Sequence, residues 1–141
     1  MTDIGLDESI TIGAPIERVW EALTTPDRIK EWFFGVDTES DWKEGSPIVH
    51  RGEYQGRPYE DKGTILAIDP PRLLVHSHWS PASGLPDAAE NYERVSWELA
   101  ERDGGTELTI REANLASEEA RATSEQSWRM VLQNLKKLLE G

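Results

Sequence analysis

Apolar residues in the last part of the chain recur with the period of an α-helix. Between Thr123 and Leu139 they lie three or four positions apart, so a helix over this segment has one apolar side. Thr123 and Gln126 have the spacing of a capping box, which predicts that the helix begins there. A helix of this kind needs cover from other elements. The residues of its apolar side are Trp128, Val131, Leu132, Leu135, Leu138 and Leu139.

Two short helices are predicted near the start of the chain, after a first strand at residues 7–12. That strand is rich in β-branched residues. Pro15 and Pro26 each stand where a helix can begin, because the N–H that proline lacks has no helical partner at that position. Apolar residues at helical spacing follow each proline, and they predict helices over residues 16–23 and 26–33.

The middle of the chain changes to a period of two, which is typical of strands. Turns that contain Pro or Gly separate the alternating segments. Residues 80–91 hold two Pro and one Gly and predict a long irregular loop. We take this loop as a candidate lid, because long loops in compact domains are often functional. The predicted strands lie at residues 38–42, 48–54, 57–68, 73–79, 95–99 and 106–111.

This order of elements predicts one α+β domain over residues 1–141. Strands joined by short turns form an antiparallel sheet, one face of which needs cover. The terminal helix is the only predicted element long enough to supply that cover. A close fit between helix and sheet gives a packed core, whereas a loose fit leaves a cavity, with the two short helices closing one end.

The composition excludes several partners. There are 15 Lys and Arg against 27 Asp and Glu, a formal net charge of −12. Such acidity repels phosphate backbones and anionic membrane surfaces, so we expect neither nucleic-acid binding nor membrane insertion. No run approaches the ~20 apolar residues of a membrane span, and we expect a cytoplasmic protein. The chain has no Cys, which excludes disulfides, thiol catalysis and thiolate metal sites.

Several segments resemble a known superfamily. The run ITIGAPIERVWEALTTPDRIKEWF at residues 10–33 resembles the start of Bet v 1-like or START-like (SRPBCC) proteins. More narrowly, the chain is similar to bacterial proteins related to the C-terminal domain of the Hsp90 ATPase activator. The segment 59–79, the strands VSWEL and GGTELTI, and the closing helix at 128–140 carry the same resemblance.

The resemblance implies a helix-grip fold, in which a curved antiparallel β-sheet wraps around the long C-terminal helix, with two short helices after the first strand. It implies no single activity, because this fold hosts carriers, cyclases, ligand sensors and co-chaperone domains. The family name implies stimulation of Hsp90.

The aromatic residues are the strongest indication of a binding site. Most of them are expected in the core, since aromatic side chains bury much apolar area. Others are expected to line a cavity for an apolar or aromatic molecule. Phe34, beside Gly35 and outside the helical stripe, is expected at its rim. The candidate cavity residues are Trp32, Phe33, Phe34, Trp42, Tyr59, Trp79, Trp97 and Trp128.

The histidines are candidates for a metal site. His76 and His78 are two positions apart on a predicted strand and share a face, as paired ligands would, and His50 is a third candidate. However, residues of the opposite parity, such as Val75, look like the core face, which turns both histidines outward. We therefore predict no metal site.

The sequence offers little support for catalysis. No His–Asp partner is implied for Ser127, and the acidic run at residues 37–44 is typical of a solvated face. Gly104 and Gly105 fit a hairpin turn better than a phosphate loop. We predict no catalytic residue and no cofactor, and the sequence favours a non-catalytic protein over an enzyme.

Three functions follow from these observations. The first is a non-catalytic binding domain for a hydrophobic small molecule or lipid, held between the sheet and the last helix. The second is an interaction or stress-accessory domain that binds a protein partner through the outer face of the sheet, as the Hsp90-activator resemblance implies. The third is an enzyme of the cyclase or hydratase kind. Neither acidity nor periodicity distinguishes among them.

Overall fold

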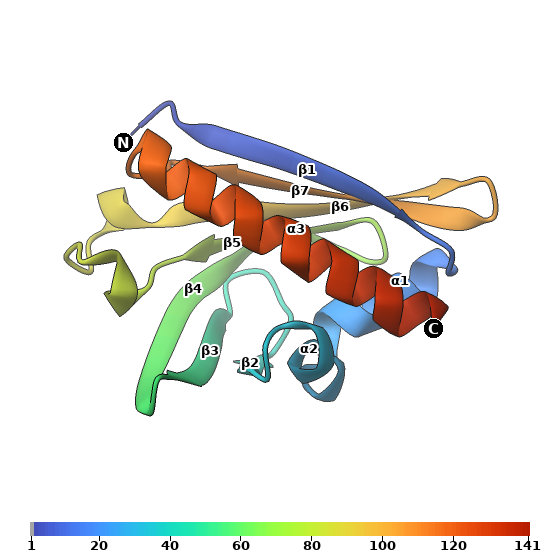
Figure 1. Cartoon of the computed structure of the whole chain (residues 1–141), viewed down its shortest axis with the longest axis horizontal. Coiled ribbons are helices and arrows are strands. Elements are labelled where there is room, and N and C mark those ends of the chain that lie inside the picture. The colour runs from blue at the N-terminus through green and yellow to red at the C-terminus, as the bar shows by residue number, and fades with distance from the viewer. Residues whose placement is uncertain (1) are drawn as a thin grey trace.

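The computed structural model describes residues 2–141, and its elements follow the predicted order (Figure 1). One strand comes first, two short helices follow it, then a run of strands and a long helix. The bounds are β1 Gly5–Ile12, α1 Ile16–Thr24, α2 Pro26–Trp32, β2 Asp37–Ser40, β3 Pro47–Tyr54, β4 Arg57–Asp69, β5 Leu73–His78, β6 Glu93–Arg102, β7 Gly105–Ala113 and α3 Glu118–Glu140. Two 3-10 turns, Pro81–Ser83 and Ala89–Asn91, lie between β5 and β6.

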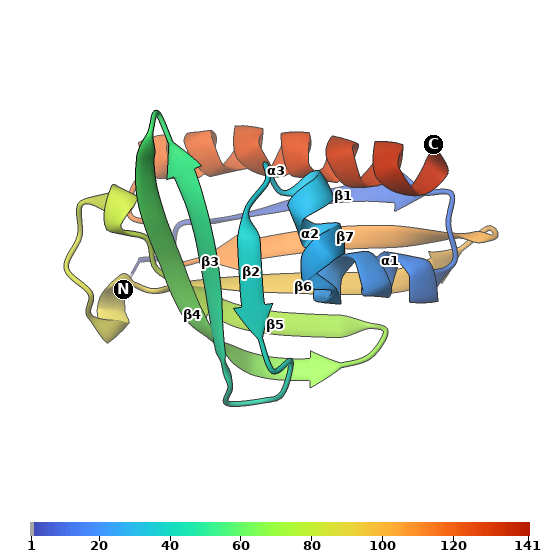
Figure 2. The ribbon, with the colours of Figure 1, turned by 90° about the horizontal axis from the view of Figure 1, so that it is seen from below.

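The strands form one curved antiparallel sheet. Its order is β1-β7-β6-β5-β4-β3-β2, a meander that β1 completes by pairing with β7. Figure 2 shows β2 and β3 running across the direction of β5, β6 and β7, while β4 curves from one direction to the other. The sheet therefore wraps around α3, which confirms the predicted helix-grip arrangement.

The bend in the sheet depends on β4. The pairing of β4 with β5 shifts register between Ile65 and Ala67, and an irregularity of this kind bends a strand. Close by, Gly63 lets the two strands approach, because a Cβ on it would lie 1.7 Å from the carbonyl oxygen of Ser77. Only glycine fits there without moving the backbone.

Helix α3 begins earlier than the capping-box prediction. Ser117 is its N-cap, and the Ser117 hydroxyl accepts a hydrogen bond from the Ala120 N–H at 3.1 Å. Thr123 lies inside the helix and donates to the carbonyl of Glu119. The first turn carries Glu118 and Glu119, which suit the positive end of the helix dipole. This exposed turn has no apolar side, so the apolar period could not reveal it.

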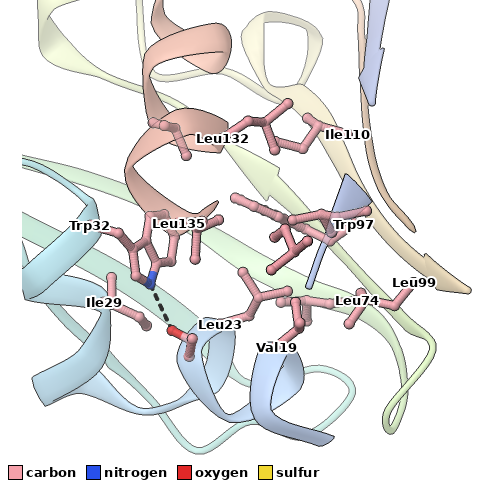
Figure 3. Close-up of a cluster of buried hydrophobic side chains, with 14 of the residues drawn as sticks. Val19, Leu23, Ile29, Trp32, Leu74, Trp97, Leu99, Ile110, Leu132 and Leu135 are labelled. Carbon is pink, nitrogen blue, oxygen red and sulfur yellow. Dashed lines mark hydrogen bonds between the residues drawn. The ribbon is translucent and has the colours of Figure 1, made fainter. Parts of the chain in front are cut away.

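The core lies where the C-terminal half of α3 meets α1, α2 and the sheet. Leu132 and Leu135 of α3 point toward Ile110 and Trp97 of the sheet (Figure 3). Trp32 of α2 donates its Nε1–H to the carbonyl of Ala22 in α1 at 2.8 Å, which ties the two short helices together. The predicted apolar side of α3 is confirmed, with Val131, Leu132, Leu135 and Leu139 buried and Trp128 and Leu138 packed against them.

Among residues 2–141, no helix combines the length and apolar character that crossing a bilayer requires.

Candidate functional site

A cavity of about 210 Å³ lies between α3 and the concave face of the sheet. Ser124, Ser127, Trp128 and Val131 line it from α3, at the three- and four-residue spacing that places them on one side of the helix. The N-terminal half of α3 therefore faces the cavity, whereas the C-terminal half packs in the core. The apolar walls come mainly from Leu23, Ile29, Trp32, Phe33, Ile48, Leu74, Val95 and Trp97.

Most of the predicted aromatic residues surround this cavity. Trp97 is central, with ring centroids 5.7 Å from Trp32 and 5.5 Å from Trp128, the latter edge to face. The ring of Phe33 continues this aromatic wall, and its centroid lies 5.5 Å from that of Trp32. The predicted residues that line the cavity are Trp32, Phe33, Phe34, Trp42, Trp97 and Trp128. Whether they contact a ligand remains a prediction.

Phe34 lies at the mouth of the cavity. It lines the cavity, yet 56% of the residue is exposed to solvent. Its φ of 53° is left-handed, which is unusual for an aromatic residue, and Gly35 follows with a φ of 75°. The backbone thus turns sharply after α2 and leaves the Phe34 ring in a position with little packing of its own.

Tyr59 and Trp79 lie elsewhere, contrary to their place among the candidate cavity residues. Tyr59 faces its cross-strand partner Gly52, on which a Cβ would lie 2.5 Å from the Tyr59 hydroxyl oxygen. Trp79 stacks on Tyr92, with ring centroids 6.4 Å apart, and donates its Nε1–H to the carbonyl of Leu85.

The candidate lid is also misplaced. None of the described residues that line the cavity comes from loop 80–91. The loop is instead held against the molecule by Asp87, which pairs with Lys62 and accepts a 2.6 Å hydrogen bond from the Tyr92 hydroxyl. The prediction that this loop covers the cavity was therefore wrong, because loop length carries no information about which side of the sheet a loop packs on.

A row of polar side chains crosses the concave face from β2 to β6. Cross-strand pairing places Thr38 opposite His50 and His50 opposite Asp61, and farther along it places His78 opposite Glu93. Hydrogen bonds join its members in two groups: Thr38 Oγ1 is 2.9 Å from His50 Nδ1, and His78 lies 3.3 Å from both Asp61 and Glu93. We call these five residues the polar row.

The inward position of the histidines corrects the sequence-based prediction. His76 and His78 line the cavity with Leu74, which has the same parity. Both parities of β5 carry buried apolar residues, since Leu74 and Val75 are each buried. Alternation could not decide which side faces inward on such a strand. No group of three or more His, Asp or Glu side chains within residues 2–141 is arranged to hold a metal ion.

His78 is a cation held between two carboxylates. Burial alone would lower its pKa, but hydrogen bonds and the charges of Asp61 and Glu93 outweigh that effect and raise the pKa to about 9. Both ring nitrogens therefore donate, Nε2 to Asp61 and Nδ1 to Glu93. Burial also opposes ionisation of Asp61, yet its hydrogen bond to His78 keeps the Asp61 pKa below the usual value.

His76 and His50 are neutral. Burial, together with the charge of His78, lowers the pKa of His76 to about 4. The Trp97 Nε1–H donates to His76 Nε2 at 3.2 Å, which assigns the His76 proton to Nδ1, 3.0 Å from the Ser77 carbonyl oxygen. Burial, with smaller contributions from His76 and His78, lowers the pKa of His50 to about 3.

Glu112 is a buried carboxyl at the edge of the cavity. Only 5% of the residue is exposed, and it accepts a 2.9 Å hydrogen bond from Trp128 Nε1. Burial first, and the charge of Glu93 second, raise the pKa of Glu112 to about 7. Glu112 therefore changes charge near neutral pH.

The sequence analysis did not identify the acidic residues of the site, although strand parity contained a signal for two of them. Glu112 has the parity of Leu108 and Ile110 on β7, which are both buried. Glu93 has the parity of Val95 and Trp97 on β6. A charged residue that continues an inward-facing apolar series is an identifiable candidate.

A curved sheet that grips a long C-terminal helix over an apolar cavity defines a helix-grip domain of the Bet v 1-like/START-like type. The family profile described as "Activator of Hsp90 ATPase homolog 1-like protein" matches residues 13–140, and the chain belongs to that family. No curated protein matches the chain.

Solved structures of the same fold include three informative ones. ChR145 from Cytophaga hutchinsonii is 45% identical, with a TM-score of 0.84 and coverage of 98% of this chain and 94% of that chain. CalU16 from Micromonospora echinospora is 29% identical, with a TM-score of 0.75 and coverage of 96% and 75%. The Aha1 dimer from Colwellia psychrerythraea is 21% identical, with a TM-score of 0.77 and coverage of 97% and 96%, and this likeness concerns the fold alone.

Proposed function

We propose that the protein binds a small, mainly apolar molecule in the cavity between α3 and the sheet, without transforming it. The observation that carries this proposal is the combination of apolar walls with a polar row at one end. Binding sites for small molecules typically have this composition, because the apolar walls supply affinity and a few polar groups fix orientation.

The size of the cavity limits the ligand. An engineered apolar cavity of about 150 Å³ is known to accommodate benzene. The cavity of about 210 Å³ therefore suits a substituted single ring or a short branched chain. A longer molecule, such as a lipid, would have to extend through the mouth beside Phe34.

The protein-interaction alternative has the support of the family name. Large exposed apolar residues would favour it if they gathered into a patch. Among the described residues these are Phe34, Leu66 and Met130, which belong to three different segments: the turn after α2, strand β4 and helix α3. We therefore rank binding of a protein partner second.

Blocking the cavity tests the proposal. Ser127 is exposed and lines the cavity, so Ser127→Phe would narrow it without removing a core residue. Gln126→Phe is the matched control, because Gln126 is the exposed neighbour of Ser127 and does not line the cavity. Ligands would come from an NMR and thermal-shift screen of small aromatic compounds and fatty acids. A ligand at 100 times its Kd should stabilise the fold by about 2.7 kcal/mol.

We expect Ser127→Phe to weaken binding of any hit at least tenfold and Gln126→Phe to leave it unchanged. A hit that binds both variants equally well occupies another site. Absence of any hit at millimolar concentration would contradict the proposal and favour the interaction alternative.

A further inference from the structure

We propose that His50 is the recognition residue of the cavity and that its Nε2–H donates a hydrogen bond to a neutral oxygen acceptor, such as a ketone, on the ligand. This inference rests on the proposed function and adds the chemical class of the ligand. It also states a selectivity: carboxylates of the same shape are rejected.

The proton of His50 can be assigned from Thr38. Thr38 is 4% exposed, and its hydroxyl has one hydrogen-bond partner among the described residues, His50 Nδ1 at 2.9 Å. A buried hydroxyl proton needs an acceptor, so Thr38 donates and Nδ1 accepts. Because the imidazole of His50 is neutral, its one proton is then on Nε2.

Within the described part of the protein, His50 forms one side-chain hydrogen bond, through Nδ1, and none through Nε2, although Asp61 stands opposite it on β4. The two neighbouring rings, His76 and His78, have centroids 6.3 and 6.1 Å away, and neither offers a lone pair. His76 Nε2 already accepts from Trp97, and both nitrogens of His78 donate to carboxylates. His50 itself is 8% exposed and lines the cavity. A donor without a protein acceptor, on a residue that lines a cavity, favours a ligand that supplies the acceptor.

The charges around His50 favour a neutral acceptor. Three carboxyl groups line the cavity, those of Asp61, Glu93 and Glu112, while His78 is the single cation and is shared by the first two. None of the described residues that line the cavity is Lys or Arg. Asp61 Oδ1 is buried without a hydrogen-bond partner among the described residues. Besides His78, the nearby Ser80 helps to lower the pKa of Asp61 and so favours its ionised form. An anionic ligand would lose its hydration here without gaining a free cation.

Three probes of similar shape distinguish the effect of the His50 hydrogen bond from the effect of ligand charge: acetophenone, α-methylstyrene and benzoate. The first has a carbonyl, the second replaces its oxygen with a CH₂ group, and the third is an anion. Each is a substituted single ring, the size for which the cavity is suited. Affinities at pH 7 would be measured by NMR titration of the full chain.

We expect acetophenone to bind about tenfold more tightly than α-methylstyrene, and benzoate to bind most weakly. His50→Asn keeps an acceptor for Thr38 but removes the donor at the Nε2 position, so it should abolish the preference for acetophenone. His50→Gln returns an N–H near that position and should restore much of the preference. The tautomer has a ligand-free test, because a long-range ¹H–¹⁵N spectrum distinguishes a proton on Nε2 from one on Nδ1.

The outcomes separate the two proposals. If acetophenone and α-methylstyrene bind equally at the cavity, the role of His50 is wrong while the binding function stands. Tightest binding by benzoate, or a proton on Nδ1 of His50, would likewise overturn the inference. If none of the three probes binds and no hit appears in the wider screen, the proposed binding function is wrong. The role of His50 as a recognition residue then falls with it, even if its proton is on Nε2. Should a variant not fold, the comparison of the three probes on the unmodified chain still decides.

Discussion

At the scale of single residues, the site contains ionisable groups whose pKa values are shifted in opposite directions by their surroundings. His78 is held as a cation by Asp61 and Glu93, whereas burial keeps His50 and His76 neutral. Each group lies on the same concave face, and the difference comes from its partners. Among the described residues, His78 is the histidine that forms hydrogen bonds to carboxylates, whereas the other two rings pair with Thr38 and Trp97.

These pKa values predict a pH dependence of stability. The pKa of His78 rises from 6.5 to about 9 on folding, so its stabilising contribution is complete below pH 6.5 and is lost as the pH rises through 9. We expect the free energy of unfolding to fall between pH 7 and 9 by up to about 1.4 kcal/mol per pH unit. Denaturant melts of wild type and His78→Gln would measure this, and an equal slope in both would contradict it.

Ionisation of Glu112 affects the stability of the fold at lower pH than that of His78. Its pKa rises from 4.5 to about 7 on folding, so the folded state disfavours the charged form and stability falls as the pH rises from about 4.5 to 7. His50 and His76 oppose this trend, because their lowered pKa values make the fold lose stability as the pH falls below 6.5. Together with His78, which lowers stability above pH 6.5, these groups place the highest stability at or slightly below pH 6.5.

Phe34 is expected to contribute to binding rather than to folding. Because its φ is 53° and the residue is 56% exposed, Phe34→Asp removes little packing, and Asp tolerates a left-handed backbone better. We predict a change in stability below about 0.5 kcal/mol and at least fivefold weaker ligand binding. Met130→Asp is the control, since Met130 is 57% exposed and does not line the cavity. Equal effects of both variants on binding would refute a specific role for Phe34.

At the scale of secondary-structure elements, α3 has two parts with different tasks. Its C-terminal half contributes Leu132, Leu135 and Leu139 to the core, and its N-terminal half contributes Ser124 and Ser127 to the cavity. The sequence pattern describes only the first part well, because a helix face that borders a cavity needs no continuous apolar stripe.

Leu135 should be essential for the packing of α3. The residue is fully buried, and Leu135→Ala should destabilise the fold by about 2–5 kcal/mol. Leu138 is only partly buried, so Leu138→Ala should cost less. Denaturant melts would check this, and a loss below about 0.5 kcal/mol for Leu135→Ala would show that α3 does not pack as described.

The start of α3 can be located by mutating its two candidate caps. Ser117→Ala removes the side-chain acceptor for the Ala120 N–H and should cost about 1 kcal/mol. Thr123 lies within the helix, where alanine is the better helix former, so Thr123→Ala should be neutral or slightly stabilising. The reverse order in thermal melts would favour a helix that begins at Thr123.

At the scale of the whole molecule, the order of elements could be predicted from the sequence, whereas the pairing of side chains across strands in the polar row could not. Apolar periodicity and the two prolines locate the helices and strands, because these signals are local. The polar row depends on register between strands: Asp61 and His78 are 17 positions apart and meet only because β4 and β5 are paired. Nothing in their local sequence distinguishes them from surface residues.

The central claim is that a small molecule occupies the cavity beneath α3, and the six Trp residues allow a direct test. Trp32, Trp42, Trp97 and Trp128 line the cavity, whereas Trp20 and Trp79 do not. In a ¹H–¹⁵N NMR titration with acetophenone, the indole N–H signals of Trp97 and Trp128 should shift most, and those of Trp20 and Trp79 should remain in place. Shifts confined to Trp20 and Trp79, or no shift of any indole signal at millimolar ligand, would contradict the claim.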